Sequence, residues 1–340
     1  MKILLNFYIL TFLFCGALTA QESKTEVSFM FYNTENFFDS ENDTTLNDDE
    51  YLKTAERRWS PLRFREKAER LAKVIIGAGK WNAPAIVGLC EIENREVLEY
   101  LCKTEPLSKY HYKIIHKDSP DPRGIDVALL YRPDVFHPLD YEAISVKNPE
   151  NKAFRTRDIL KVNGILFGCD TLALFVNHWP SRYGGLMETK KLRQIASNTL
   201  KQSIENTIQT EKSVKIVCMG DFNDTPTDES MQNLVGDGEY HTGSNPQLVN
   251  LSEALMAEVI QTIKSKYRWE VFDQFIVSDN FLKTESCSRV KAAEIYKAQF
   301  LLEKDLKYGG LKPKRTYVGF RYNDGFSDHL PVVLRLEIPH

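Results

Sequence analysis

Short apolar runs that end in polar residues recur along the whole 340-residue chain. The clearest is "CMGDFND" (218–224), where an apolar run passes directly into Gly, Asp, Phe, Asn and Asp. A strand this apolar lies inside a sheet, and polar groups at its end cost free energy unless something binds them. Gly, Asn and Asp are also ordinary turn residues, so this heptapeptide alone fits a simple turn equally well.

The spacing of apolar residues predicts an α/β protein with packed sheets. Helical periodicity covers 63–79 and 190–209. Strand-like runs occupy 27–36, 83–94, 125–131, 171–179, 213–224, 270–278 and 329–338. Because no long linker divides these elements, we expect 21–340 to form a single domain.

Five of the predicted strands begin or end in residues that can bind a divalent cation or an oxyanion. These residues are Asn33 and Glu35, Glu91 and Glu93, Asn177 and His178, Asp221 and Asn223, and Asp328 and His329. One polar strand end is a turn, but five in one chain indicate a single site where strand ends converge.

The strongest metal-ligand candidate is Glu91, which directly follows an apolar strand. An unpaired carboxylate there would be costly, and a hard cation such as Mg²⁺ would compensate it. Glu93 fits the alternative role of a cap for a helix starting near 95. Asn33 is either an oxygen ligand or orienting amide, or an N-cap or turn residue.

Two histidines lie beside predicted strands. His178 follows a strand and, with Arg182 nearby, could contact a phosphate, although a lone histidine is more often a satisfied structural residue. His329 follows Asp328 and titrates in the range needed to act on a phosphate or a water. Asp273, a carboxylate inside an apolar strand, needs a partner such as a histidine ring.

Composition excludes several classes of function. A net charge of −3 gives no broad cationic field for long nucleic acid, although Arg182, Lys190, Lys191 and Arg193 form a basic cluster. No GxxxxGK phosphate loop is present. The acidic stretch 39–50 matches several EF-hand positions, but Thr44 stands where the turn requires Gly, so a solvated acidic loop is expected.

The first 20 residues have the layout of a secretory signal peptide, with cleavage after Ala20 and a retained membrane anchor as the alternative. We therefore expect a secreted or periplasmic protein. Five cysteines follow, an odd number at wide spacing without a CxxC pair, which predicts neither a disulfide framework nor a zinc site. Three lie in apolar runs and are expected to be small core residues: Cys90, Cys169 and Cys218.

Taken in order, the motifs around Asn33, Glu91 and His178, then "GDFND", "DQFIVS" and "SDH", resemble those of the endonuclease/exonuclease/phosphatase superfamily, the deoxyribonuclease I-like hydrolases. The resemblance extends from about 26 to 338. It implies an α/β (α+β) fold, a four-layer αββα sandwich with two mostly antiparallel sheets packed face to face and helices outside.

The resemblance also implies roles for single residues. The metal would be held by Glu91, with Asn33 nearby and Asp328 in support. The predicted catalytic residues are His178, Asp221, Asn223, Asp273 and His329, with Asp273 fixing the His329 ring. The predicted substrate-binding residues are Arg157, Asn177 and Arg182.

The function expected from these features is a secreted phosphoesterase that depends on Mg²⁺ or Mn²⁺, with Ca²⁺ as a further candidate. The preferred hypothesis is a nuclease that uses metal-assisted in-line attack by water on a phosphodiester. The rivals are a phosphatase, phospholipase or sphingomyelinase acting on phospholipid or inositol-phosphate head groups, and a non-catalytic binding module on the same fold. The expected partner is nucleic acid or another phosphoester, with no obligate protein partner and no integral membrane association.

Overall fold

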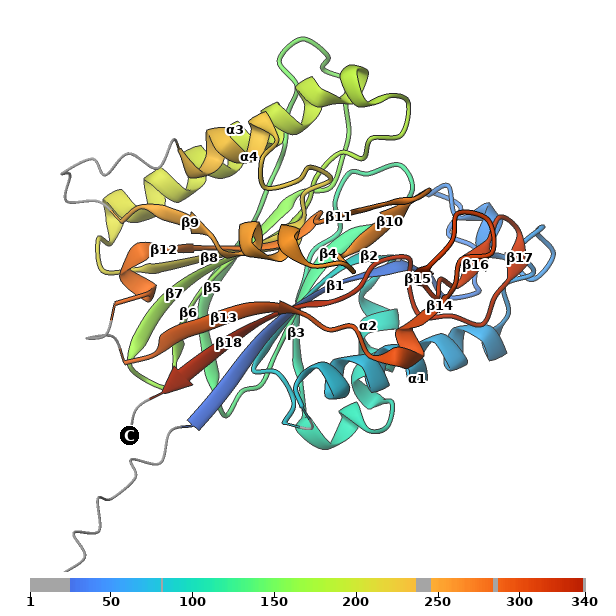
Figure 1. Ribbon diagram of the computed structural model, residues 1–340, viewed down its shortest axis with the longest axis horizontal. Coiled ribbons are helices and arrows are strands. Elements are labelled where there is room, and N and C mark those ends of the chain that lie inside the picture. Colours follow the sequence, from blue (N-terminus) through green and yellow to red (C-terminus); the bar gives the residue numbers. More distant parts are fainter. Residues whose placement is uncertain (1–24, 81, 237–245, 284–286, 339–340) are drawn as a thin grey trace, which may run out of the picture.

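The computed structural model describes residues 25–80, 82–236, 246–283 and 287–338, and its centre is a pair of six-stranded sheets (Figure 1). The first sheet contains, in spatial order, β13 (Arg289–Ile295), β18 (Val332–Ile338), β1 (Thr25–Phe37), β2 (Ile86–Ile92), β4 (Asp126–Tyr131) and β3 (Lys113–His116). The second contains β5 (Phe136–Ile144), β6 (Ile159–Leu166), β7 (Asp170–His178), β8 (Lys215–Asp221), β12 (Asp273–Ser278) and β9 (Leu248–Asn250).

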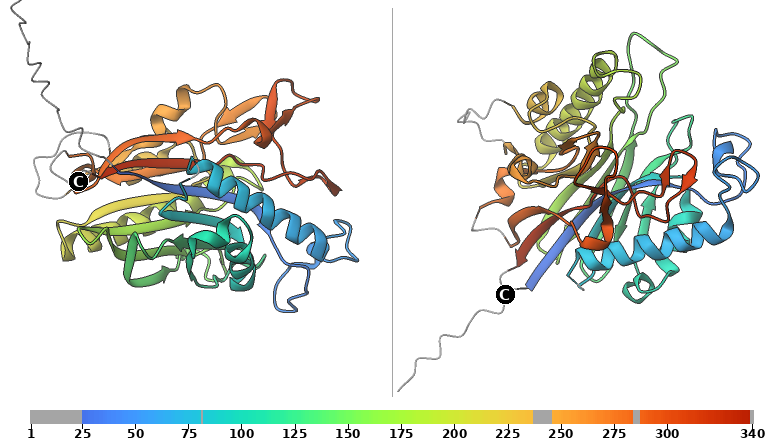
Figure 2. Two further views of the ribbon diagram at one scale, coloured as in Figure 1. Left: turned by 90° about the horizontal axis from the view of Figure 1, so that it is seen from below. Right: turned by 45° about the vertical axis from the view of Figure 1, so that its right-hand side comes forward.

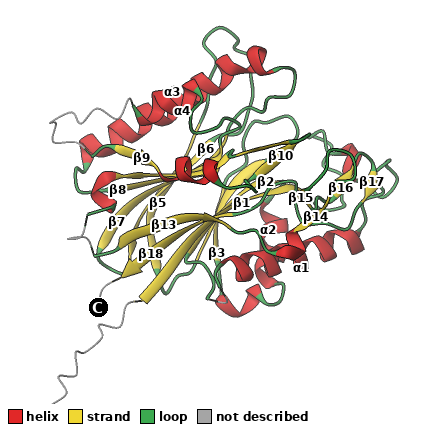
Figure 3. Ribbon diagram, viewed as in Figure 1, coloured by secondary structure: helices red, strands yellow, loops and turns green. Residues whose placement is uncertain are grey.

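Helices cover the outer faces of both sheets, which gives the four layers that were expected (Figures 2 and 3). The first sheet is covered by α1 (Pro61–Ala78) and α2 (Arg95–Lys103), and the second by α3 (Leu186–Thr210) and α4 (Glu229–Val235). Within the two sheets only β1–β2 and β7–β8 pair in parallel, and every other neighbouring pair is antiparallel. The predicted sandwich is confirmed.

The smaller elements are three hairpins and five 3-10 helices. The hairpins are β10–β11 (Ile263–Ser265 and Arg268–Glu270), β14–β15 (Leu302–Lys304 and Leu311–Pro313) and β16–β17 (Tyr317–Val318 and Arg321–Tyr322). The 3-10 helices are η1 (Asp49–Tyr51), η2 (Leu107–Tyr110), η3 (Leu251–Ala257), η4 (Asp279–Phe281) and η5 (Gln299–Leu301). All three hairpins fall between the β9 and β18 strands in the chain.

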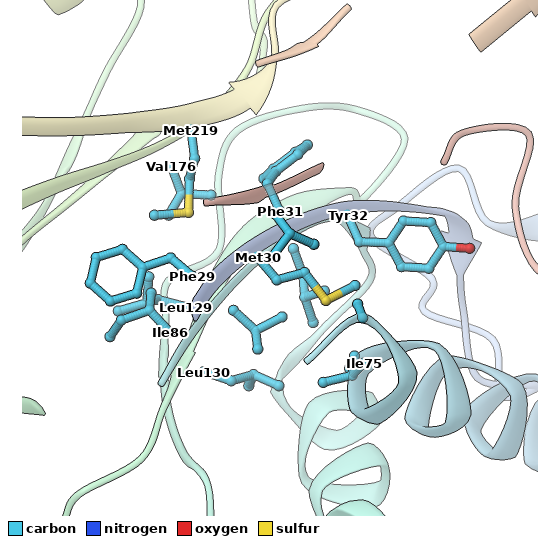
Figure 4. Close-up of a cluster of buried hydrophobic side chains, with 14 of the residues drawn as sticks. Phe29, Met30, Phe31, Tyr32, Ile75, Ile86, Leu129, Leu130, Val176 and Met219 are labelled. Carbon is cyan, nitrogen blue, oxygen red and sulfur yellow. The ribbon is translucent and has the colours of Figure 1, made fainter. Parts of the chain in front are cut away.

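The main core lies between the two sheets and beneath α1 (Figure 4). Successive side chains of β1 point to opposite faces, so Phe31 faces Met219 of the second sheet while Met30 faces Ile75 of α1. A Cβ on Gly88 of β2 would lie 2.6 Å from the sulfur of Met219, which shows how closely the sheets approach. A second core lies between the other face of the second sheet and the helices α3 and α4.

The cysteine prediction was wrong in one respect. Cys169 and Cys287 form a disulfide that joins the β6–β7 turn to the segment before β13, 118 residues later in the chain. Cys169 is therefore an exposed crosslinked residue, whereas Cys90 and Cys218 are buried and free as expected. Wide spacing in sequence was no guide, because the fold brings these two turns to the same end of the sandwich.

No helix within the described ranges combines the length and apolar content that crossing a bilayer requires. The predicted signal peptide and its cleavage point lie outside the described residues.

Candidate functional site

One end of the second sheet carries a row of three ionisable side chains. His178, the last residue of β7, pairs in register with Asp221, the last residue of β8, and Asp221 pairs with Asp273, the first residue of β12. Because side chains alternate along a strand, these residues share a face with Val176, Met219 and Phe275. The row therefore continues the core-facing surface of the sheet to the ends of these strands, where polar side chains replace apolar ones.

A β-bulge brings Glu91 from the first sheet to the same place. Strict alternation along β2 would turn Glu91 away from the second sheet, because Gly88 faces Met219. The β2–β4 register instead shifts between Cys90 and Ile92, and Glu91 adopts a φ of 59°. Bulges commonly redirect a side chain at an active site. Here the carboxylate Oε1 of Glu91 lies 3.9 Å from His178 Nε2.

Asn33 links the two sheets through its side-chain amide. Its Nδ2 donates to Glu91 Oε1 at 3.3 Å and to Asp221 Oδ2 at 3.1 Å, while its Oδ1 accepts from the Glu35 backbone N–H. The amide therefore orients two carboxylates from different sheets. Of the two roles considered for Asn33, this geometry favours the orienting amide over a direct oxygen ligand.

His329 is held by a buried carboxylate, as the sequence suggested. Its Nδ1 lies 2.7 Å from Asp273 Oδ2, and its Nε2 lies 3.7 Å from Asp221 Oδ2. Burial opposes a charge on this ring, but Asp273 and Asp221 outweigh it and raise the pKa of His329 well above its ordinary value. His329 is thus an imidazolium that points its Nε2 toward the cluster.

His178 has the opposite electrostatic character. Burial, followed by the positive charges of Arg157, Arg123 and His329, lowers the pKa of His178 well below its ordinary value. Its Nε2 lies 3.7 Å from Asp221 Oδ2, and its buried Nδ1 has no hydrogen-bond partner among the described residues. The two histidines on either side of Asp221 are therefore one neutral and one charged ring.

The donor set fits a divalent cation. Burial raises the pKa of Asp221 to about 6, so its carboxylate is ionised at neutral pH despite lying beside Asp273. Side-chain atoms of Asp221, Asp273 and His329 lie within 4.8 Å of one another, and Glu91 adds a partly exposed carboxylate linked through Asn33. Mg²⁺ and Mn²⁺ favour such carboxylate-rich sets, and Glu91 and Asp221 are the residues that would hold the ion.

Asp328 does not lie in this cluster as a free ligand. Its Oδ2 pairs with Arg315 at 3.0 Å, and the same guanidinium donates to Glu35 Oε1 at 2.8 Å. Burial opposes ionisation, but Arg315 and His329 outweigh it and lower the pKa of Asp328. The expected metal support from Asp328 is therefore replaced by an ion pair that positions the residue next to His329.

Asn223 and Asn177 are both used by the backbone around the cluster. The Asn223 N–H donates to Asp221 Oδ1 at 3.0 Å, which fixes the carboxylate, and its side chain donates to the Trp179 carbonyl. Asn177 is fully buried, donates to the carbonyls of Phe175 and Met219 and accepts from the Trp179 indole. The structure therefore gives Asn177 a structural position instead of the substrate-facing one that was expected.

The two predicted substrate arginines are also committed to protein partners. Arg157 is buried and donates to the carbonyls of His178 and Trp179 and to Asp121. It supports the end of β7 from behind and does not face substrate.

Arg182 donates to the Asn223 carbonyl at 2.8 Å and pairs with several carboxylates. These are Asp224, Asp228 and Glu270, at 3.1, 2.7 and 3.2 Å. A guanidinium surrounded in this way braces the β8–α4 loop, and a phosphate would have to compete with three carboxylates for it.

Glu93 and the acidic stretch 39–50 also have structural roles. The N-cap of α2 is Asn94, not Glu93, because the Asn94 side chain accepts from Val97 N–H at 3.0 Å. Glu93 instead accepts from Asp39 N–H, and burial raises the pKa of Glu93 to about 8. Asp43 accepts from Thr45 within the acidic loop, as a self-contained turn would.

Sequence reasoning missed two cations beside the site. Lys67 is completely buried in α1 and donates to the carbonyls of Glu35 and Phe326 and to Thr316 Oγ1, which ties the end of β1 to the segments before β16 and after β17. The burial of Lys67 could have been predicted from the sequence, since Lys67 falls four residues before Leu71 on the apolar stripe of the helix. Arg123 acts electrostatically on both His178 and Glu91, and nothing in its local sequence indicated this.

Comparison with known proteins gives a consistent result. Residues 28–338 match the model of the Endonuclease/Exonuclease/phosphatase family. No curated protein matches the chain.

Three solved structures illustrate the likeness in fold. D. rerio TDP2 complexed with single-strand DNA product has 16% identity and a TM-score of 0.55, covering 92% of this chain and 99% of that one. An endonuclease/exonuclease/phosphatase family protein from Bacteroides thetaiotaomicron has 15% identity and a TM-score of 0.56, covering 93% and 96%. The human Nocturnin catalytic domain with bound sulfate has 18% identity and a TM-score of 0.55, covering 94% and 98%.

Proposed function

Because this chain belongs to the endonuclease/exonuclease/phosphatase family, and is thus a metal-dependent hydrolase of phosphate esters, we propose that it is an exported nuclease that hydrolyses phosphodiester bonds in DNA or RNA. The observation that carries the proposal is the convergence of Glu91, Asp221 and His329 from different strands, each linked to the next by Asn33 or by a contact of 3.7 Å. Such a set has no purpose in a binding module of the same fold, because an uncompensated cluster of buried charges destabilises the protein.

The chemistry assigned to each residue follows from its protonation state. Glu91 and Asp221 would hold a divalent ion, which when bound would supply positive charge that offsets the negative charge of the phosphate. Asp221, an ionised carboxylate fixed by Asn33 and Asn223, orients the attacking water and accepts its proton. His329, an imidazolium held by Asp273, donates from Nε2 to a phosphoryl oxygen as negative charge develops there. His178, which is neutral, lines the other side of the phosphate.

A basic and aromatic hairpin beside the site supports nucleic acid as the substrate. Ile263 of β10 bridges to His329, and Thr262 next to it accepts from the Asp273 N–H. Lys266 and Tyr267 form the tip of this β10–β11 hairpin, Arg268 follows as the first residue of β11, and Tyr267 is 76% exposed. Exposed aromatic rings flanked by cations bind single strands by stacking and by phosphate contact. The DNA product in the D. rerio TDP2 structure shows that the fold accommodates such a ligand in that protein.

Export is proposed from two independent features. The first 20 residues have the composition of a signal peptide. The Cys169–Cys287 disulfide is of a kind that persists in oxidising compartments and is rare in the cytosol.

A phospholipid or sphingomyelin head group is the second candidate substrate, and one surface feature favours it. The loop that follows His178 exposes Tyr183 (93%), and the first turn of α3 exposes Leu186 and Met187. Three neighbouring exposed apolar side chains suit insertion into a membrane surface.

The test compares substrates directly. Purified protein with Mg²⁺ or Mn²⁺ is incubated with single-stranded DNA, plasmid DNA, RNA, sphingomyelin vesicles and bis(4-nitrophenyl) phosphate, with and without EDTA, beside His329→Ala. We expect cleavage of nucleic acid that is lost with EDTA and reduced at least about 100-fold in the variant. Cleavage of lipid alone would replace the nuclease by the second candidate, and equal activity of wild type and variant would remove the site assignment.

A further inference from the structure

We propose that a hollow beside the catalytic cluster binds a nucleotide flanking the scissile bond of a single-stranded substrate, an inference that rests on the proposed nuclease function. The hollow has a volume of about 490 Å³ and is formed mainly by the β5–β6 loop. It is lined by Pro120, Ser145, Val146, Lys147, Asn148, Pro149, Asn151, Lys152, Phe154 and Arg155, and is called the 145–155 hollow below.

The 145–155 hollow is strongly basic. Lys147, Lys152 and Arg155 are all exposed, and none of them has a carboxylate within ion-pair distance in the part of the chain that the structure describes. Glu150 pairs with Lys191 of α3 at 2.5 Å, and Asp158, at the end of the same loop, acts on Lys147 from beyond ion-pair distance. Three cations that lack an ion-pair partner among the described residues, gathered around one cavity, are the arrangement expected for a polyanionic ligand.

An aromatic ring and apolar side chains complete the lining. Phe154 is half-buried and Val146 is buried, so both are fixed by the protein and present apolar surface to the cavity. Arg155 donates to the carbonyls of Lys152 and Phe154 at 2.7 and 2.9 Å, which holds the loop around the cavity. A nucleobase offers a flat face to such a ring, while its phosphates reach the surrounding cations.

The hollow is joined to the catalytic cluster by hydrogen bonds. Two residues beyond Arg155, Arg157 donates to the carbonyls of His178 and Trp179, and it also donates to Asp121, the neighbour of Pro120. Asp121 also accepts from Arg123, whose side chain is 48% exposed and whose charge acts on both Glu91 and His178. Arg123 is thus a half-exposed cation that acts on the cluster and is bonded to Asp121, next to Pro120 of the hollow, and we expect it to contact the phosphate backbone.

The strand directions place the β5–β6 loop and the β3–β4 loop at the catalytic end. β5 ends at Ile144 and β6 starts at Ile159, and the start of β6 pairs with the end of β7 that carries His178. β3 ends at His116 and β4 starts at Asp126, and the start of β4 pairs with the end of β2 that carries Glu91. The shape favours a nucleotide over a membrane, because Val146 is buried and Phe154 is half-buried, while the three cations of the hollow are exposed.

The test uses Lys147→Gln/Lys152→Gln, which removes two exposed charges without touching the core. Lys103→Gln/Lys113→Gln, the same charge change at exposed residues of α2 and β3, is the matched control. Binding of a fluorescein-labelled single-stranded 12-mer, as DNA and as RNA, is measured by anisotropy at several salt concentrations in Ca²⁺. Cleavage of the 12-mer and of bis(4-nitrophenyl) phosphate is measured in Mg²⁺ or Mn²⁺.

We expect the Lys147/Lys152 variant to bind the 12-mer about 10-fold more weakly, with the slope of log K against log salt reduced by about 1.4, since two phosphate contacts are lost. Its kcat/KM on bis(4-nitrophenyl) phosphate should equal that of wild type, and the control should match wild type throughout. Phe154→Leu should weaken 12-mer binding with an unchanged salt slope, because it removes stacking and keeps the charges.

The outcomes separate this inference from the proposed function. If the Lys147/Lys152 variant binds the 12-mer as tightly as wild type, and wild type cleaves nucleic acid, the inference about the hollow is wrong and the proposed nuclease function is unaffected. Binding that depends on Lys147 and Lys152 without any cleavage of nucleic acid supports the hollow and overturns the nuclease. If the Lys147/Lys152 variant loses binding to phosphatidylserine vesicles but keeps its binding to the 12-mer, the hollow is not a nucleotide site.

Discussion

At the scale of single residues, the position of Glu91 depends on one extra residue in β2. The bulge turns its carboxylate to the mouth of the sandwich, where Asn33 and the Asn36 N–H hold it. We expect Glu91→Gln to lower kcat/KM by at least about 100-fold and to weaken metal binding, because the charge that holds the ion is lost. Steady-state kinetics across a Mg²⁺ titration measure both effects.

Glu93→Gln is the matched control for Glu91→Gln. It removes a carboxyl group two residues away that burial already favours in its neutral form, and its amide oxygen can still accept from Asp39 N–H. Activity close to wild type is expected. A comparable loss in both variants would show that the defect is structural and would contradict the metal role of Glu91.

A second prediction concerns the charge on His329. Asp273 and Asp221 raise the pKa of its imidazole, so the ring stays protonated to alkaline pH, and its contribution to stability is complete below about 6.5 and is lost as pH rises through the raised pKa. In Asp273→Asn the pKa falls toward the ordinary value. The alkaline limb of the kcat/KM profile should therefore move to lower pH by at least about one unit. An unmoved limb would show that another group sets it.

Residue types at strand ends could be predicted from the sequence, but their hydrogen-bond partners could not. Asn33, Glu91, His178, Asp221, Asp273 and His329 do converge. Asn177, Arg157, Arg182 and Asp328 have suitable chemistry, yet their polar groups are taken by neighbouring carbonyls and ions. A sequence shows which groups a side chain carries, while their availability depends on the folded surroundings.

At the scale of elements, the close contact of β7 and β8 sets the distance between His178 and Asp221. A Cβ on Gly220 would lie 2.5 Å from the Asn177 carbonyl oxygen in the paired strand. Gly220→Ala should lower the free energy of unfolding by about 1–3 kcal/mol and reduce activity by displacing one strand end from the other. Urea denaturation and kinetics measure these effects.

Cys218→Ala, in the same strand, is the control for Gly220→Ala. Its side chain faces the core beneath α3, so a smaller loss of stability and normal activity are expected. If Gly220→Ala were as active as this control, strand spacing would not limit catalysis.

The elements that periodicity predicted have an apolar face, but one strand with such a face was missed, since Val162 and Leu166 of β6 are buried in the core. The helices at 63–79 and 190–209 occur as α1 and α3 with shifts of a few residues. The edge strand β5 escaped prediction because most of its residues are exposed and several are polar. The short hairpins of two to three residues per strand were beyond any periodicity argument.

At the scale of the whole molecule, the Cys169–Cys287 disulfide links the turn that starts β7 to the segment before β13, at the end opposite His178. Cys169→Ser/Cys287→Ser should lower the free energy of unfolding by about 2–4 kcal/mol, because the crosslink restricts the unfolded chain. Since it is remote from the cluster, kcat/KM should not change. Denaturation with and without reductant tests this, with Cys102→Ser as control, and a loss of activity in folded protein would contradict it.

The catalytic cluster draws its members from both sheets: His178, Asp221 and Asp273 come from the second, while Asn33 and Glu91 come from the first. Neither sheet alone carries the complete cluster, so catalytic activity shows that the two sheets have assembled. During refolding, activity should return with the last docking step, later than the recovery of far-ultraviolet ellipticity. A newly made chain whose halves have not yet closed is consequently without hydrolase activity.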